Sequence, residues 1–232
     1  PMAISTHLRF LPLLATVVLS GIAQAAPPFF GTVFIDRDII TPADPSTFLD
    51  LTYTGRGVRT LFDRRVDRFV SVNAFLFKSK YGDSKALEIR VNPEFKTKTA
   101  AIKLARKYSK VIGRLPICIR ANLKTVSINN GKQPFGGGTQ DLLIHVLQGD
   151  EYETQGVLEE TMVHELSHVT LDGLYASSAG WIAAQKADPE FISQYASDFP
   201  TRENVAESFL PYLALKYRRE RISDETAASI TT

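Results

Sequence analysis

Residues 161–172, TMVHELSHVTLD, constrain the fold of this chain more than any other stretch. The stretch has helical spacing, and residues four apart on a helix lie one above the other on the same face. His164 and His168 therefore share a face. A separate apolar stripe is formed by Leu158, Met162, Leu166 and Val169. A helix with one apolar side and one histidine side is what an active-site helix needs, because one side packs in a core and the other is free for a site.

The two histidines and the acid between them suit metal chemistry. Two imidazoles on one helical face can direct ring nitrogens at a single metal ion. Glu165 follows His164 directly, and from there it can reach a water molecule bound to that ion and take its proton. A structural helix that carries two histidines and no metal is the alternative. Ligand-bearing residues in a second segment of the chain would favour a metal site over a structural helix.

The third ligand of such a site is expected to be a carboxylate. A hydrolytic zinc site takes three protein ligands and keeps one position open. Leu174 stands where the metzincin peptidases have their third histidine. The other histidines of the chain are His7, near the N-terminus, and His145, in a predicted strand.

Residues 201–209, TRENVAESF, offer that carboxylate. Thr201 is the expected N-cap of a second helix. Glu203 and Glu207 lie four apart on it, and the apolar residues around them indicate that the helix is largely buried. Buried acids need a partner, and a metal ion with histidine ligands is one. The alternative is that both acids are solvated on an amphipathic helix.

The two segments together resemble a known family. HELSH at residues 164–168, followed by ENVAE at residues 203–207, resembles the gluzincins, the thermolysin-type zinc peptidases. The second segment, with Tyr195 eight residues before Glu203, looks most like the catalytic domain of anthrax lethal factor. The chain is also similar to a group of secreted metallopeptidase-like proteins, through YTGRG, VNPEF, FGGG and DPEF.

The resemblance implies a role for each residue of the site. The implied Zn²⁺ ligands are His164, His168 and Glu203. By the same pattern, Glu165 is the general base, and Glu207 accepts a hydrogen bond from the free ring N–H of a histidine ligand. Tyr195 would stabilise the oxyanion, and Tyr175 and Tyr152 are its rivals. The residues that bind the rest of the substrate stay unknown.

The order of strand-like and helix-like segments predicts an α+β fold. Residues 26–60 are rich in Pro, Gly, Asp and Thr, and are expected to be a loop-rich N-terminal part. Strands are predicted at residues 69–79, 86–92, 123–129 and 140–149, the first two as a hairpin, and helices at residues 97–113, from 157 and from 201.

The resemblance refines this prediction to a zincin-like fold. It implies a small mixed sheet with a backing helix, an active-site helix, and a C-terminal helix that carries the third ligand. It also implies that the strand at residues 140–149 pairs with extended substrate. His145 then either faces the cleft or is an ordinary residue of the sheet.

The first 25 residues have the pattern of a secretory signal peptide, with a polar start, an apolar run and the sequence Ala-Gln-Ala. The apolar run is shorter than the roughly 20 residues that a membrane-spanning helix needs. Cleavage after Ala25 is therefore expected to release a secreted chain without stable membrane insertion. Residues 26–232 are interpreted as a single metallopeptidase-like domain.

The charge of the chain bears on its class of partner, and its cysteine content bears on whether disulfide bonds stabilise it. The chain has 27 basic and 25 acidic side chains, a formal net charge of +2, and no large basic field that would favour nucleic acid. Cys118 is the only cysteine, so no intramolecular disulfide can form. Its apolar surroundings, PICI, predict a buried, inert thiol, and an intermolecular disulfide is the alternative.

Two functions and one alternative without metal follow from these patterns. The first is a secreted zinc-dependent endopeptidase that cuts a peptide or protein substrate with a metal-activated water. The second is a catalytically silent zinc-binding or partner-binding protein on the same fold, since fold and activity are separable. The third is a structural domain without metal.

Overall fold

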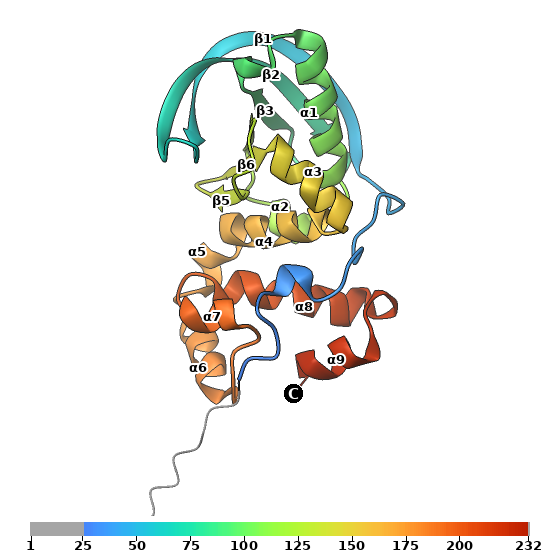
Figure 1. The fold of residues 1–232 in the computed structure, drawn as a ribbon, viewed down its shortest axis with the longest axis vertical. Helices are drawn as coiled ribbons and strands as arrows, with labels where there is room; N and C mark the ends of the chain where they lie inside the picture. The colour runs from blue at the N-terminus through green and yellow to red at the C-terminus, as the bar shows by residue number, and fades with distance from the viewer. Residues whose placement is uncertain (1–25, 232) are drawn as a thin grey trace, which may run out of the picture.

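The computed structural model describes residues 26–231, so the predicted signal segment lies outside the described residues. The prediction of an α+β fold is confirmed: a mixed sheet forms one half of the molecule and a group of helices forms the other. In Figure 1 the sheet, α1 and α3 form the upper part of the molecule, and α5 to α9 form the lower part. Helix α4 (Leu158–Thr170), which carries the HELSH sequence, runs between the halves.

The described strands form one mixed sheet in the order β1-β2-β3-β4-β6-β5. The strands are β1 (Phe48–Asp63), β2 (Arg68–Tyr81), β3 (Leu87–Val91), β4 (Thr125–Asn129), β5 (Gly136–Gly138) and β6 (Asp141–His145). Strands β3, β4 and β6 run parallel, and the predicted hairpin of β2 with β3 is present. Strand β5 pairs antiparallel with β6 and is the last strand of the sheet on the side of α4.

The long first strand corrects the prediction for the N-terminal part. Residues 26–60 were expected to be loop-rich, but β1 begins at Phe48 and pairs with β2 down to Asp63. Its Gly and Thr residues resemble a turn, yet Gly55 serves a β-bulge. The register of β1 shifts between Tyr53 and Gly55, where Gly55 has a φ of 111° that suits glycine alone. Pairing along the whole of β2 outweighs the weak local preference.

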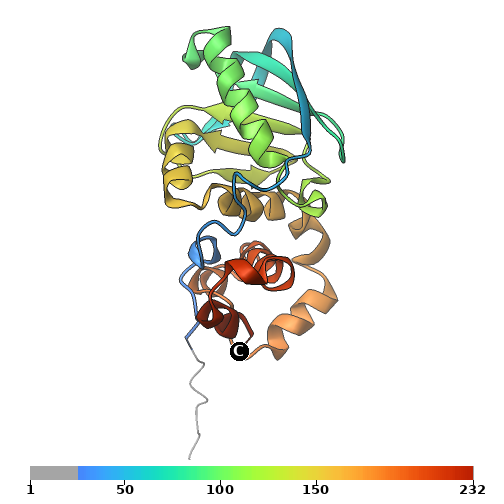
Figure 2. The same cartoon turned by 90° about the vertical axis from the view of Figure 1, so that its right-hand side faces the viewer.

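Helix α1 (Lys98–Ile112) covers one face of the sheet, as the apolar spacing of residues 97–113 predicts. Thr97 caps its start, because the Thr97 side chain accepts the Ala100 N–H at 3.1 Å. Ala101, Ala105, Tyr108 and Ile112 are fully buried on one side of the helix. They pack on a core that contains Ile89, Val126, Ile128, Leu142 and Ile144. Figure 2 shows α1 lying across the strands.

The strand predicted at residues 140–149 is wrong in its second half. Strand β6 ends at His145, and α3 (Val146–Gln155) follows without a loop. The apolar run continues past His145 into the helix, where Val146 is buried but Leu147 is 43% exposed. Gly149 allows α3 to approach α1, since a Cβ at Gly149 would lie 2.4 Å from the Tyr108 hydroxyl oxygen.

The helical half is built around α8 (Asn204–Tyr217), which packs on α4. The other short helices are α2 (Ile117–Arg120), α5 (Asp172–Tyr175), α6 (Ala179–Ala187), α7 (Gln194–Asp198), α9 (Asp224–Thr231), η1 (Thr32–Phe34), η2 (Pro93–Phe95) and η3 (Arg219–Arg221). Segments from both ends of the described chain meet here, because η1 also packs on α8. No helix among residues 26–231 is long and apolar enough to cross a bilayer.

Cys118 contradicts the prediction that it is buried. It lies exposed in α2, a helix of one turn at the surface. In α2 the inward positions belong to Ile119 and Arg120, which are 0% and 3% exposed. The buried guanidinium of Arg120 donates to the Leu115 carbonyl at 2.9 Å and to Asp83 at 2.5 Å. An apolar neighbourhood in sequence therefore did not define which side chain turned inward.

Gly137 fixes the contact between the sheet and α4. A Cβ at Gly137 would lie 1.8 Å from the Glu165 carbonyl oxygen, whereas a Cβ at Gly138 would meet nothing within 4 Å. We expect Gly137→Ala to lower the free energy of unfolding by about 1–3 kcal/mol or more. The added Cβ would clash with the backbone of α4, which cannot move as a flexible side chain could. Gly138→Ala is the matched control. Equal denaturation midpoints for the two variants would contradict this close contact.

Candidate metal centre

Helix α4 places its two histidines between its core side and α8. The apolar residues Leu158, Met162 and Leu166 are at most 2% exposed and belong to the main core. His164 and His168 lie one turn apart on another side, with ring centroids 4.9 Å apart. The predicted division of this helix into an apolar side and a histidine side is therefore present in the structure.

Glu203 reaches the histidines from the beginning of α8. The helix starts at Asn204, so Glu203 occupies the N-cap position, and the prediction of Thr201 as N-cap is wrong. The Glu203 N–H donates to the Phe199 carbonyl at 2.8 Å, which closes a tight turn before the helix. A carboxylate at a helix N-terminus is also favoured by the helix dipole. The turn holds the side chain of Glu203 against α4.

Three atoms with lone pairs converge between the two helices. We call His164, His168 and Glu203 the metal triad. The two Nε2 atoms are 3.2 Å apart. The Glu203 Oε2 atom lies 3.3 Å from His164 Nε2 and 3.1 Å from His168 Nε2. These atoms form one group that could hold a metal ion.

The geometry of the metal triad fits a small tetrahedral cation. Ligand bonds of about 2.0–2.1 Å at tetrahedral angles place ligand atoms about 3.3 Å apart. Glu203 Oε2 is buried and lies between the two imidazole Nε2 atoms. Its other oxygen accepts the Arg202 Nε–H at 2.7 Å. One oxygen is thus held by the protein, and the other is left for a ligand.

The carboxylates around the triad favour positive charge at its centre. Burial alone lowers the pKa of His164, but Glu203 and Glu207 outweigh it and raise the pKa to about 10. Burial is likewise outweighed at His168, where Asp172 and Glu203 raise the pKa to about 9. At Glu203 the imidazoles outweigh burial and hold the pKa well below its usual range. A divalent cation would supply this charge in place of the protons.

Glu207 lies behind His164, one helical turn beyond Glu203. Its Oε1 is 3.2 Å from His164 Nδ1. Its Oε2 accepts the Ser193 hydroxyl at 2.5 Å and the Thr32 N–H at 2.8 Å. Glu207 therefore ties the N-terminal segment and the start of α7 to the back of one imidazole. This contact leaves His164 Nε2 facing the centre of the triad.

Asp172 holds His168 in the same way, and the sequence prediction missed this role. Its Oδ2 lies 2.7 Å from His168 Nδ1. No contact with a histidine was predicted for Asp172 from residues 161–172. The signal was present, because Asp172 follows His168 by four residues and so falls on the same helical face. Both histidines thus have a carboxylate behind Nδ1.

Removing the carboxylate behind His168 should weaken metal binding. We expect Asp172→Ala to lower zinc affinity by about 10–100-fold, because nothing then fixes the imidazole with Nε2 toward the ion. Competition with a chromophoric chelator measures the affinity. Asp172→Asn is the control that keeps an acceptor and removes the charge, and it should lose less. An unchanged affinity in Asp172→Ala would contradict the assigned role of this carboxylate.

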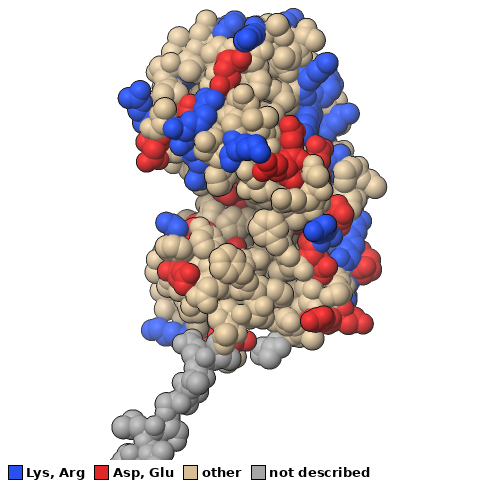
Figure 3. Space-filling view, viewed as in Figure 1, with Lys and Arg blue, Asp and Glu red and all other residues tan. Residues whose placement is uncertain are grey.

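A cleft of about 480 Å³ opens over the metal triad. Besides the triad and Asp172, its lining consists of Arg64, Gly137, Gly138, Glu165, Tyr195 and Arg202. Glu165 is thus in the cleft and outside the ligand group. Figure 3 shows the molecule hollowed between its sheet half and its helical half. The sequence prediction missed Arg64 and Arg202, which are brought to the cleft by segments far apart in the chain.

Tyr195 is the one of the three candidate tyrosines that lines the cleft. It lies on α7, with its ring centroid 6.5 Å from that of His164. Burial and the Glu203 carboxylate raise its pKa, so the phenol keeps its proton and can donate a hydrogen bond. Tyr152 instead packs on Phe135 at 5.2 Å between ring centroids, and Tyr175 is 49% exposed outside this cleft.

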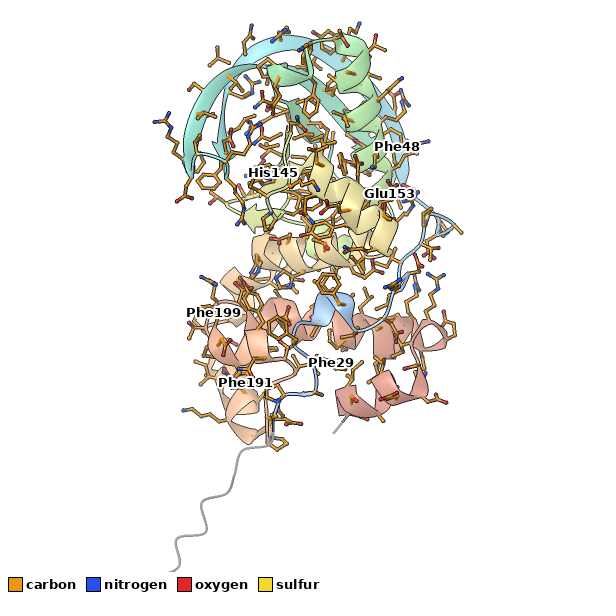
Figure 4. The ribbon with its side chains drawn as sticks, viewed as in Figure 1. Phe29, Phe48, His145, Glu153, Phe191 and Phe199 are labelled. Atoms are coloured by element: carbon orange, nitrogen blue, oxygen red, sulfur yellow. The ribbon has the colours of Figure 1, made fainter. Side chains whose placement is uncertain are left out.

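His145 stays in the sheet half and does not line the cleft. It is the last residue of β6 and is fully buried. Figure 4 shows His145 above α4 and Phe199 on the opposite side, by α7. Burial lowers the pKa of His145 and keeps its ring neutral. The structure therefore favours the interpretation of His145 as an ordinary residue of the sheet over one that faces the cleft.

Comparison of the chain with family models, curated proteins and solved structures finds no match. The chemistry of the cleft and of the residues around it is therefore the basis for the function.

Proposed function

We propose that this protein is a secreted zinc-dependent endopeptidase of the gluzincin type. The observation that carries the proposal is the convergence of His164 Nε2, His168 Nε2 and Glu203 Oε2 in one cleft that Glu165 also lines. Two imidazoles and one carboxylate are a usual ligand set of hydrolytic zinc, and each imidazole is backed by a carboxylate. The signal-peptide pattern of residues 1–25 supports secretion.

Each cleft residue has a distinct part in this proposal. Zinc, when bound by the metal triad, supplies the charge that polarises a carbonyl and lowers the pKa of water to about 7. Glu165 accepts the proton of the attacking water and then passes it to the leaving amine. Tyr195 donates a hydrogen bond to the oxygen on which negative charge develops. Glu207 and Asp172 keep the imidazoles in place.

The arrangement around α4 supports a zincin-like architecture, with one change to the predicted substrate strand. Residues 140–149 were expected to pair with substrate. Strand β6 already has β4 and β5 as neighbours, so it offers no free edge. Strand β5 has a single neighbour among the described strands and lines the cleft through Gly137 and Gly138. We therefore assign substrate pairing to β5, where main-chain hydrogen bonds give affinity with little sequence demand.

A peptide-library digest tests this function. Protein loaded with zinc should cut internal peptide bonds, a chelator should abolish cleavage, and added zinc should restore it. Mass spectrometry of the products gives the cleavage sites. One zinc per chain without cleavage would contradict the peptidase and favour the silent binding protein. Absence of zinc binding would favour a structural domain without metal.

A further inference from the structure

The tip of the β1–β2 hairpin is held rigidly beside the cleft. Asp63, which is 7% exposed, accepts from the Arg65 side chain at 2.9 and 2.8 Å. Arg65 also donates to Glu94 at 2.6 Å, which ties the tip to η2, just after β3. The Phe62 carbonyl accepts the Asn129 side-chain N–H at 3.0 Å. The hairpin is therefore anchored by Arg65, and its neighbour Arg64 has no part in that anchor.

Arg64 extends over β5 with its charge unpaired. No ion pair or hydrogen bond joins its side chain to another residue in the described part of the chain. A Cβ built at Gly136 would lie 2.7 Å from Arg64 Nη2, so the guanidinium rests on the backbone of the edge strand. Arg64 lines the metal cleft and also a groove of about 510 Å³ next to it. Arg64 therefore lies where the cleft and the groove join.

The groove carries positive charge that the protein does not neutralise. Lys124 lines it, is exposed, and makes no ion pair among residues 26–231. Arg90, by contrast, pairs with Glu88 at 2.6 Å. The carboxylate in the lining, Asp141, is engaged by Thr125 at 2.5 Å, and burial raises its pKa. Figure 3 shows Lys and Arg side chains above and below the hollow on its left side.

An apolar wall lies beside the free guanidinium. Phe62 and Phe69 line the groove, with ring centroids 5.2 Å apart. Phe69 is 70% exposed, which is unusual for a large aromatic side chain. A groove with an apolar wall, a free strand edge and an unpaired arginine suits an extended peptide that carries an acid.

We propose that Arg64 binds a carboxylate of a peptide lying along β5, so that this protein selects substrates that are acidic on the hairpin side of the metal. The inference rests on the proposed function for the cleft, and it adds the class of substrate. Guanidinium binds carboxylate through two parallel N–H groups, which gives direction as well as charge. The carboxylate is either an Asp or Glu side chain or the C-terminus of the peptide.

Binding without turnover tests the inference separately from catalysis. The probes are fluorescein-labelled hexapeptides of Val and Thr, in which Glu or Gln is placed at each position in turn. One series is amidated at the C-terminus, and a second series ends in a free carboxylate. Fluorescence anisotropy with zinc-loaded Glu165→Gln protein reports affinity whether or not the wild-type protein cleaves peptides. A failed digest would therefore leave this measurement intact.

We expect at least one carboxylate-bearing probe to bind about fivefold or more tightly than its neutral partner, the gain of one exposed charged contact. The preference should vanish in Arg64→Gln and weaken at high salt. Arg68→Gln is the matched control, because Arg68 lies exposed on the same hairpin and lines neither the cleft nor the groove. It should keep the preference.

The two probe series identify the source of the carboxylate. A gain from internal Glu in the amidated series assigns a side chain, and a gain confined to the free-carboxylate series assigns the peptide C-terminus. Equal affinity of acidic and neutral probes at every position would overturn the inference. So would a preference that survives in Arg64→Gln.

Discussion

Glu165→Gln should lower the rate of peptide hydrolysis by about 10²–10⁴-fold and leave zinc bound, since a general base contributes that much. Glu165 lines the cleft but is outside the group of three ligand atoms. Gln has the same shape and cannot accept the proton of the attacking water. The cleavage rate of a peptide identified in the library digest measures the loss, and elemental analysis measures the zinc.

The control for this result is a carboxylate remote from the cleft. Glu151 lies on α3 and pairs with Lys132, so Glu151→Gln removes a charge without touching the site. Its hydrolysis rate should match that of the wild-type protein. Full activity in purified Glu165→Gln protein would sink the proposed mechanism, whatever the zinc content.

Glu203→Ala should abolish zinc binding under conditions that saturate the wild-type protein. Loss of a residue behind a ligand costs about 10–100-fold in affinity, so loss of a ligand should cost more than about 100-fold. The substitution removes the oxygen that lies within 3.3 Å of both imidazoles. It also removes the charge that holds the pKa of His164 and His168 high, and so removes part of the attraction for a cation. Competition with a chromophoric chelator measures the affinity.

A second acid from the same region separates this effect from a general loss of charge. Asp198 is exposed on α7, where it accepts from Gln194 at 2.7 Å. Asp198→Ala should bind zinc as the wild-type protein does. Circular dichroism of the metal-free proteins establishes that Glu203→Ala is folded. Retained stoichiometric zinc in folded Glu203→Ala protein would contradict the assigned ligand group.

Local spacing predicted the parts of the site that lie on single helices. The four-residue interval placed His164 and His168 on one face because helix geometry alone sets that relation. The same rule put Glu203 and Glu207 in line at the beginning of the second segment. Apolar periodicity likewise predicted α1, and the strand-forming residues of β2 and β3 predicted their hairpin.

Local sequence patterns did not predict the contacts between segments that are distant in the chain. Strand β5, of three glycines, carries no side-chain pattern, so its position over Glu165 depends on pairing with β6 and packing on α4. Arg64 reaches the cleft because β1 and β2 extend far beyond β3, a length set by pairing between them. Residues 140–149 changed from strand to helix at His145, although their apolar run is continuous.

The sequence by itself determined which residues carry ligand atoms and which of them share a helical face. Only the tertiary structure decided that α8 meets α4 with Glu203 Oε2 within 3.3 Å of both Nε2 atoms, and that Arg64 reaches the cleft from the tip of the β1–β2 hairpin. The physical reason is range. Helix periodicity acts over four residues, whereas the meeting of two helices and the overhang of a hairpin depend on burial of apolar surface summed over the whole chain.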